Sequence, residues 1–217
     1  MVTPETLTDA YKRAGIPVAY RALNPDGLEK TGAVSTLWTP CLEHAKAWRD
    51  GEQIERGLLI AGSQGSGKST ALWLLARAAI KAEVSQQTDL PNKAIPTVKI
   101  FCRKFQLWVE DELKPQPGEH NWNQGKCRRE MLDASAIFLD DLTLDPAKDV
   151  YRPVKEFLTI LFDELSDNIE SPIPLYLTSN NSYAELENLL GAQVLDRLCG
   201  KKHGLCEIIK CDWKSFR

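Results

Sequence analysis

The sequence has no hydrophobic run long enough to cross a membrane, which takes about 18 apolar residues in a row. Its first ten residues are polar and acidic, without the basic and apolar segments of a signal peptide. These absences predict a cytoplasmic protein with no membrane partner. Internal repeats and low-complexity segments are also missing, which argues against a repeat architecture.

Cysteine pairs of the Cys-x-x-Cys type are missing among the six cysteines of the chain. A chain of 217 residues buries enough surface to fold without a disulfide framework, so reduced thiols are predicted. The group Cys199, His203, Cys206 and Cys211 contains zinc-ligand residue types, but its spacing matches no established ligand pattern. Buried thiols are the favoured interpretation of this group, and a zinc site is the alternative.

An excess of positive charge is missing too. The chain carries 27 basic and 30 acidic side chains, for a net charge of −3. A protein that holds duplex DNA alone through phosphate contacts is usually basic. We therefore expect any contact with nucleic acid to use a local patch or several subunits acting together.

The sequence does contain apolar strands that alternate with amphipathic helices. The predicted strands are Arg56–Gly62, Thr97–Phe101, Ala136–Asp140, Pro174–Ser179 and about Leu205–Cys211. The predicted helices are Lys68 to about Ala82, Phe105–Leu113, Gln124–Ala134, one with Pro153 at its first position, and one begun by a capping box of Ser182 and Glu185. This alternation predicts an α/β fold, a doubly wound core of about five parallel strands with helices on both faces. Residues 1–50 lack the alternation and are predicted to be an N-terminal extension packed on the domain of residues 51–217.

A loop of the form Gly-x-x-x-x-Gly-Lys-Ser joins the first predicted strand to the first predicted helix. Glycines in such a loop let backbone N–H groups converge on phosphate oxygens at the positive end of a helix. Lys68 would reach the β- and γ-phosphates of ATP, and the Ser69 hydroxyl would take one position on Mg²⁺. This context makes a chance glycine-rich turn a poor explanation. The predicted nucleotide-binding residues are Gly62, Ser63, Gln64, Gly65, Ser66, Gly67, Lys68, Ser69 and Thr70.

Polar side chains follow two of the later predicted strands. Asp140 ends the third strand, Asp141 comes next, and Asn180 ends the fourth. Because ligands gather at strand ends in parallel sheets, Asp140 is predicted to bind Mg²⁺ and Asp141 to orient and activate the attacking water. The Asn180 carboxamide would contact the γ-phosphate and that water. The alternatives are a solvated turn for the two aspartates and an ordinary turn with a helix cap for Asn180.

In combination, these motifs resemble the DnaC/DnaI/IstB group of AAA+ ATPases, which are helicase loaders and transposition helpers of bacteria and phages. The segments that carry the resemblance are AGIPVAYR from Ala14, GLLIAGSQGSGKST, IFLDDL, LYLTSNNS, LDRLCG and WKSFR, in the family's order over almost the whole chain. The resemblance implies that Asn180 is the sensor-1 residue. It also implies that Arg197 is an arginine finger for ATP on a neighbouring subunit, and that Arg217 makes a sensor-2-like contact with the nucleotide.

The same resemblance implies DNA contacts from the helices between the second and third predicted strands. The basic and aromatic candidates there are Arg103, Lys104, Lys126, Arg128, Arg129, Trp108 and Trp122. Acidic residues are interspersed among them, so solvated helix faces with core tryptophans are an equal alternative.

The family thus implies an ATPase that uses ATP and Mg²⁺ to remodel or load a replicative helicase on single-stranded DNA and that self-associates through Arg197. Thirteen residues precede Ala14, so we expect no separate helicase-binding domain. Asp141 stands where most AAA+ enzymes have glutamate, which implies slow turnover. The alternatives are an IstB-like transposition helper, a P-loop kinase and a non-hydrolysing ATP switch. The aspartate pair and Asn180 argue against the kinase.

Overall fold

The computed structural model describes residues 4–22, 35–87, 98–109, 122–147, 151–168, 170–201 and 204–211. Within these ranges one sheet contains the strands β1 (Gly57–Gly62), β2 (Ile100–Lys104), β3 (Ala136–Asp140), β4 (Leu175–Ser179) and β5 (Cys206–Cys211). All of its pairings are parallel, and the strand order is β2-β3-β4-β1-β5. The predicted core of five parallel strands is confirmed.

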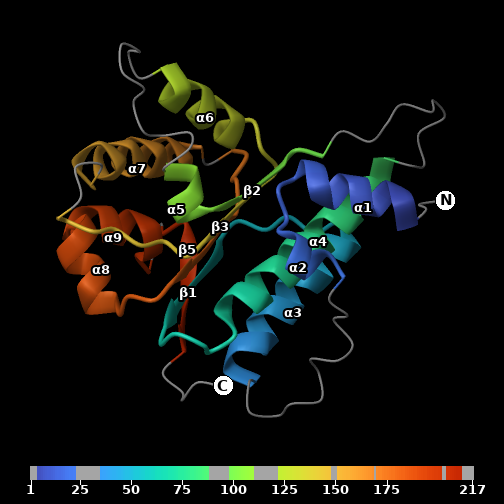
Figure 1. The fold of residues 1–217 in the computed structure, drawn as a ribbon, viewed down its shortest axis with the longest axis horizontal. Coiled ribbons are helices and arrows are strands. Elements are labelled where there is room, and N and C mark those ends of the chain that lie inside the picture. Colours follow the sequence, from blue (N-terminus) through green and yellow to red (C-terminus); the bar gives the residue numbers. More distant parts are fainter. Residues whose placement is uncertain are drawn as a thin grey trace.

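Helices cover both faces of this sheet (Figure 1). One face carries α1 (Pro4–Arg13), α2 (Val18–Arg21), α3 (Ser35–Asp50) and α4 (Lys68–Gln87). The other face carries α5 (Phe105–Trp108), α6 (Trp122–Leu132), α7 (Tyr151–Asp167), α8 (Tyr183–Leu190) and α9 (Ala192–Cys199). Each face has its own cluster of buried apolar side chains, so the sheet separates two hydrophobic layers.

The strands differ in burial according to their place in the sheet. β1, β3 and β4 are buried along their whole length, because helices cover them on both sides. β2 extends to Lys104, beyond the predicted end at Phe101, because it pairs with β3 as far as Lys104 opposite Asp140. Thr97, where this strand was predicted to begin, lies outside the described residues.

α4 is the central helix of its layer. More than half of its residues are buried, because the sheet covers one side of it and α1, α2 and α3 pack on others. These three helices come from the segment in which no regular pattern was predicted. The proposed division of the chain at residue 50 stays a prediction.

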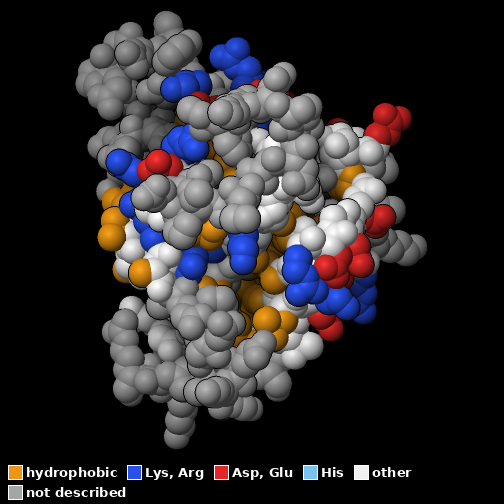
Figure 2. All heavy atoms as spheres, turned by 90° about the vertical axis from the view of Figure 1, so that its right-hand side faces the viewer, with side chains coloured by type: hydrophobic (Ala, Val, Ile, Leu, Met, Phe, Trp, Pro, Cys, Tyr) orange, Lys and Arg blue, Asp and Glu red, His pale blue; other side chains and the backbone are white. Residues whose placement is uncertain are grey.

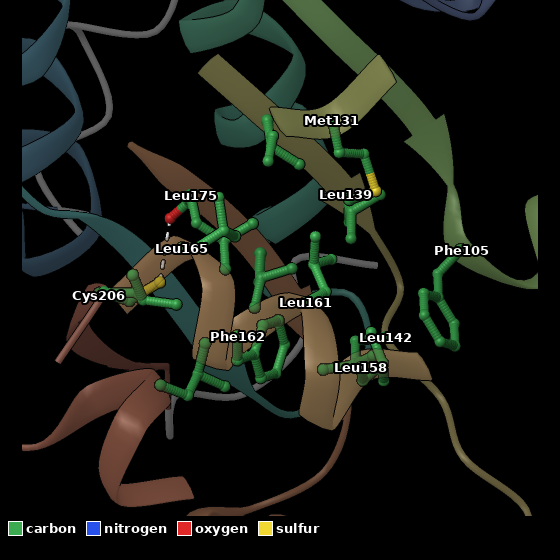
Figure 3. Close-up of a cluster of buried hydrophobic side chains, with 14 of the residues drawn as sticks. Phe105, Met131, Leu139, Leu142, Leu158, Leu161, Phe162, Leu165, Leu175 and Cys206 are labelled. Carbon is green, nitrogen blue, oxygen red and sulfur yellow. Dashed lines mark hydrogen bonds between the residues drawn. The ribbon is translucent and has the colours of Figure 1, made fainter. Parts of the chain in front are cut away.

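α7 packs its apolar stripe on the sheet. Leu158, Leu161, Phe162 and Leu165 point into a buried cluster that includes Leu175 of β4 (Figure 3). The helix begins at Tyr151, two residues earlier than predicted. The prediction that Pro153 stands at the first position is therefore wrong. Pro153 is the third residue of α7. Proline is tolerated at that position because the first N–H groups of a helix have no intrahelical acceptor.

The cysteines are not gathered into a metal site within the part of the chain that the structure describes. Cys199 and Cys206 lie in the cluster under α7, whereas Cys211 lies in the cluster on the opposite face of the sheet. Residues an odd number of positions apart on a strand point to opposite faces, which separates the two thiols of β5. His203 lies outside the described residues, and no group of three metal-ligating side chains occurs within them. All six cysteines are buried and none of them forms a disulfide, as the favoured interpretation predicted.

Among the described helices, none combines the length and the apolar content needed to cross a membrane.

α3 is connected to the sheet by a partly buried polar cluster. His44 Nδ1 lies 3.0 Å from the hydroxyl oxygen of Tyr176 in β4, and Trp48 Nε1 donates to the same oxygen at 3.2 Å. Burial lowers the pKa of His44, while the carboxylates of Glu207 and Glu43 act in the opposite direction. The folded protein therefore binds a proton at this ring less readily than the unfolded chain does.

We predict that this histidine makes stability fall as the pH drops below the ordinary histidine pKa of about 6.5, since protonation then favours the unfolded chain. His44→Gln removes the titrating ring. Urea unfolding at about pH 7 and about pH 5.5 measures the difference. The wild type should lose more free energy of unfolding over this interval than the variant. An equal loss in both proteins contradicts the prediction.

Candidate nucleotide-binding site

The predicted phosphate-binding loop connects β1 to α4 at the carboxyl edge of the sheet. Gly62 and Gly67 have φ angles of 147° and 88°, which side chains other than glycine rarely adopt. A Cβ atom at Gly62 would overlap the carbonyl group of Cys211 in β5. The Ser63 N–H donates to the same carbonyl oxygen at 3.2 Å. The neighbouring strand therefore fixes the start of the loop.

The Lys68 ammonium group lies within this loop. Its Nζ donates to the carbonyl oxygens of Gly62 at 2.9 Å and Ser63 at 2.6 Å, and to the Ser66 hydroxyl at 3.3 Å. Lys68 is also the first residue of α4, whose initial N–H groups have no intrahelical acceptor and form the positive end of the helix dipole. The loop thus combines a cation with a helix terminus that favours anions.

Two carboxylates lie within electrostatic reach of this ammonium group. Burial lowers the pKa of Lys68, whereas the Cys211 thiol and the carboxylates of Asp141 and Asp140 act to raise it. Asp140 ends β3 and Asp141 follows it, on the edge of the sheet from which the loop also emerges. The loop that contains Lys68 and the end of β3 therefore lie at one edge of the sheet, where Trp73 of α4 also contacts Asp140.

Asp140 is held by donors from two other elements. Trp73 Nε1 of α4 donates to Asp140 Oδ2 at 3.0 Å. The Thr178 hydroxyl of β4 donates to Asp140 Oδ1 at 2.7 Å. With only 3% of its surface exposed, Asp140 has its orientation set by these two bonds. A carboxylate has about four lone-pair positions, so acceptor capacity remains for a cation or its water.

Asp141 has an unusual backbone. Its φ angle is 62°, and among the described residues no other non-glycine residue has a positive φ. The Asp141 N–H donates to the Thr178 hydroxyl at 2.8 Å. Its Oδ1 accepts from Asn180 Nδ2 at 2.7 Å and from the Thr143 hydroxyl at 3.2 Å. Strained backbone of this kind costs about 1–3 kcal/mol and gathers at functional sites. A hydrogen bond thus connects the side chains of Asp141 and Asn180, which end up next to each other.

Trp73, Thr178 and Tyr20 contribute to this site although sequence reasoning did not select them. The rings of Tyr20 and Trp73 have centroids 6.0 Å apart. Burial, and after it the charge of Asp140, raises the pKa of Tyr20. A tryptophan in an apolar helix is indistinguishable from a core residue in the sequence. Thr178 gave only a weak signal in the sequence, because it lies two residues before Asn180, which directly follows β4.

These residues fit ATP and Mg²⁺. The glycine-rich turn, the helix terminus and Lys68 suit the phosphates, and the Asp140 carboxylate with the Ser69 hydroxyl suits a hard cation. A hollow of about 330 Å³ adjoins the start of the loop beside α8, but Lys68, Ser69, Asp140 and Asp141 do not line it. It is lined by Ala61, Gly62, Ser63, Asn180, Ser182, Tyr183, Ala184, Glu185, Ile208 and Lys210.

The predicted arginine finger lies apart from these groups. Arg197 belongs to α9, on the face of the sheet opposite α4. Its Nη1 lies 2.6 Å from Asp163 Oδ1 of α7, as an ion pair without the alignment of a hydrogen bond. Both side chains are about one-third exposed. Arg217 lies outside the described residues.

The predicted DNA-binding cations divide into two groups. Arg103 and Lys104 lie at the carboxyl end of β2, and the Arg103 guanidinium covers the Phe101 ring. The other three belong to α6, where Lys126 pairs with Glu130, Arg128 pairs with Glu164, and Arg129 donates to the Gly125 carbonyl. The two carboxylates offset part of the positive charge that α6 presents.

Trp108 does not offer a stacking surface. Trp108 is 1% exposed and packs against aromatic rings in the core, so its proposed role in base stacking is wrong. The Trp122 side chain lies outside the described residues.

On the side of the molecule that carries α1 and α2, Lys and Arg side chains lie around exposed hydrophobic ones (Figure 2). Lys12 and Arg13 of α1 are exposed cations that the predicted DNA-binding set did not include.

Comparison with solved structures finds this fold in replication proteins. The crystal structure of DnaI matches with a TM-score of 0.56 and 16% identity, over 88% of this chain and 89% of that chain. The DnaC helicase loader matches with a TM-score of 0.53 and 17% identity, over 81% and 90%. Domain III of the Thermotoga maritima replication initiation protein DnaA matches with a TM-score of 0.51 and 19% identity, over 88% and 68%. No family model and no curated protein matches the chain.

At sequence identities of 16–19%, the similarity to these structures establishes the fold alone. The chain shares the α/β fold of DnaI and the DnaC helicase loader, a five-stranded parallel sheet with helices on both faces, as the sequence predicted.

We predict that Lys68→Ala lowers the affinity for ATP by at least about 100-fold, because charge-assisted hydrogen bonds contribute about 1.5–3 kcal/mol each. Titration of a fluorescent ATP analogue measures this loss. Lys81→Ala, which removes an exposed lysine from the same helix, serves as the control and should bind as the wild type does. Unchanged affinity in Lys68→Ala would remove the assignment of the loop.

Proposed function

We propose that this chain is an ATPase that binds MgATP and acts in DNA replication, loading or remodelling a replicative helicase on single-stranded DNA. The proposal is carried by the arrangement at one edge of the sheet. Lys68 lies within the glycine-rich loop, Trp73 of the same helix donates to Asp140, and Asn180 donates to Asp141. The replication role is supported by the likeness to DnaI, the DnaC helicase loader and DnaA.

The roles of the residues follow from their chemistry. Lys68 would bind the β- and γ-phosphates, and Ser69 with Asp140 would hold Mg²⁺, which neutralises phosphate charge when bound. Asp141 would accept a proton from the attacking water. Asn180 donates to one carboxylate oxygen of Asp141 and so limits how that carboxylate turns. The shorter reach of aspartate compared with glutamate supports slow turnover.

Self-association would bring Arg197 to the ATP of a neighbouring subunit. A guanidinium stabilises the charge that develops on the transferred phosphoryl group, which couples hydrolysis to assembly. The ion pair with Asp163 is compatible with this role. A pair exposed to this degree contributes about 0–1 kcal/mol, so a phosphate can replace the carboxylate as the partner of Arg197.

Turnover measured with single-stranded DNA and replicative helicase separates the candidate functions. The proposal expects slow ATP hydrolysis that rises when DNA, helicase or both are added. Hydrolysis that depends on a transposase instead supports a transposition helper. ATP binding without turnover under every condition supports a non-hydrolysing switch, and consumption that requires a small-molecule acceptor supports a kinase.

We predict that Arg197→Ala retains wild-type ATP affinity and loses assembly-stimulated hydrolysis by about 10³-fold, the lower end for arginine fingers. Arg152→Ala is the control, since Arg152 is an exposed residue of α7 paired with Glu156. The measurement compares turnover across a range of protein concentrations, with helicase and DNA present. Wild-type turnover in Arg197→Ala would contradict the proposal that Arg197 acts on the ATP of a neighbouring subunit.

A further inference from the structure

Trp73 connects the helix of the phosphate-binding loop to the strand that carries Asp140. It lies in the second turn of α4, is fully buried, and donates its single indole N–H to Asp140 Oδ2. Tyr20 packs next to this indole, and Arg77 of α4 donates to the Tyr20 carbonyl oxygen at 3.3 Å. The N-terminal helices therefore help to hold the indole in place.

Burial alone does not account for this hydrogen bond. An indole has one donor and no acceptor, so burying it without a partner costs about 1–3 kcal/mol. Trp108 is buried to a similar extent, and its Nε1 has no hydrogen-bond partner among the described residues. The fold thus tolerates the Trp108 indole without a described partner in one hydrophobic cluster, whereas the Trp73 indole in the other cluster donates to a carboxylate.

Thr178 completes the arrangement from the opposite side of the carboxylate. Its hydroxyl donates to Asp140 Oδ1 and accepts the N–H of Asp141. A hydroxyl has one donor and two acceptor positions, so one side chain serves both neighbouring aspartates. Each oxygen of Asp140 consequently accepts one buried donor, and the carboxylate has no freedom to rotate without breaking a bond.

We propose that Trp73 and Thr178 are positioning residues that decide which lone pairs of Asp140 remain for Mg²⁺. This inference rests on the proposed function, since it concerns the cation that accompanies ATP. The indole of α4 and the hydroxyl of β4 hold the carboxylate in one rotation, so binding of the metal requires no reordering of this group. Without either donor the carboxylate can turn, and its affinity for the cation falls.

The test measures ATP affinity as a function of Mg²⁺ concentration in the wild type, Trp73→Phe and Trp108→Phe. Both variants remove a buried indole and leave a smaller ring, but only Trp73→Phe removes a donor from Asp140. Trp73→Phe should retain its affinity for ATP in the absence of metal within about twofold and raise the half-saturating Mg²⁺ concentration at least about tenfold. Trp108→Phe should keep both wild-type values.

Thr178 provides a second, independent pair of variants. Thr178→Val keeps the shape of the side chain and removes the hydroxyl, whereas Thr178→Ser keeps the hydroxyl. The first should raise the half-saturating Mg²⁺ concentration as Trp73→Phe does, and the second should restore it to within about threefold of the wild type. This pair decides the question if Trp73→Phe does not fold.

The outcomes distinguish this inference from the function on which it rests. A wild-type Mg²⁺ requirement in both Trp73→Phe and Thr178→Val overturns the inference alone. Loss of metal-free ATP affinity in Trp73→Phe, with an unchanged Mg²⁺ requirement, also overturns it, because it indicates a purely structural role. A wild-type protein whose ATP affinity does not respond to Mg²⁺ overturns both the inference and the proposed function.

Discussion

The site depends on one buried carboxylate, that of Asp140. It ends β3, the strand between β2 and β4, and it accepts hydrogen bonds from the indole of α4 and the hydroxyl of β4. A buried carboxylate is stable only when it is paired or hydrogen-bonded. These contacts therefore allow Asp140, which is 3% exposed, to lie near the phosphate-binding loop. The Thr178 hydroxyl also fixes the backbone of Asp141. The Thr178 hydroxyl therefore orders both acidic residues.

Much of this arrangement could be predicted because local sequence carries it. The end of β3 at Asp140 and the loop between β1 and α4 both follow from apolar runs that stop at polar residues or glycine. The capping box of Ser182 and Glu185 is present as predicted, since it needs only residues three positions apart. Parallel pairing then brings these strand ends to one edge of the sheet.

The rest depends on contacts between distant parts of the chain. Trp73 and Asp140 are 67 positions apart, and nothing in an apolar helix marks one indole as a donor to a carboxylate. The helices of the first 50 residues escaped prediction for a different reason. α3 contains Pro40 in its interior, which ordinarily ends a helix, and its packing on α4 compensates for that preference. Likewise, the partner of Arg197 on α7 is a tertiary contact without a local signature.

The central claim is that the loop and Asp140 act on the same MgATP. Calorimetric titration of ATP into the wild type and Asp140→Asn, each with and without Mg²⁺, tests it most directly. The variant keeps the size of the side chain and removes its charge. The account predicts that Mg²⁺ strengthens ATP binding in the wild type and has no such effect in the variant, while metal-free binding is similar in both. An equal response to Mg²⁺ in the two proteins would contradict it.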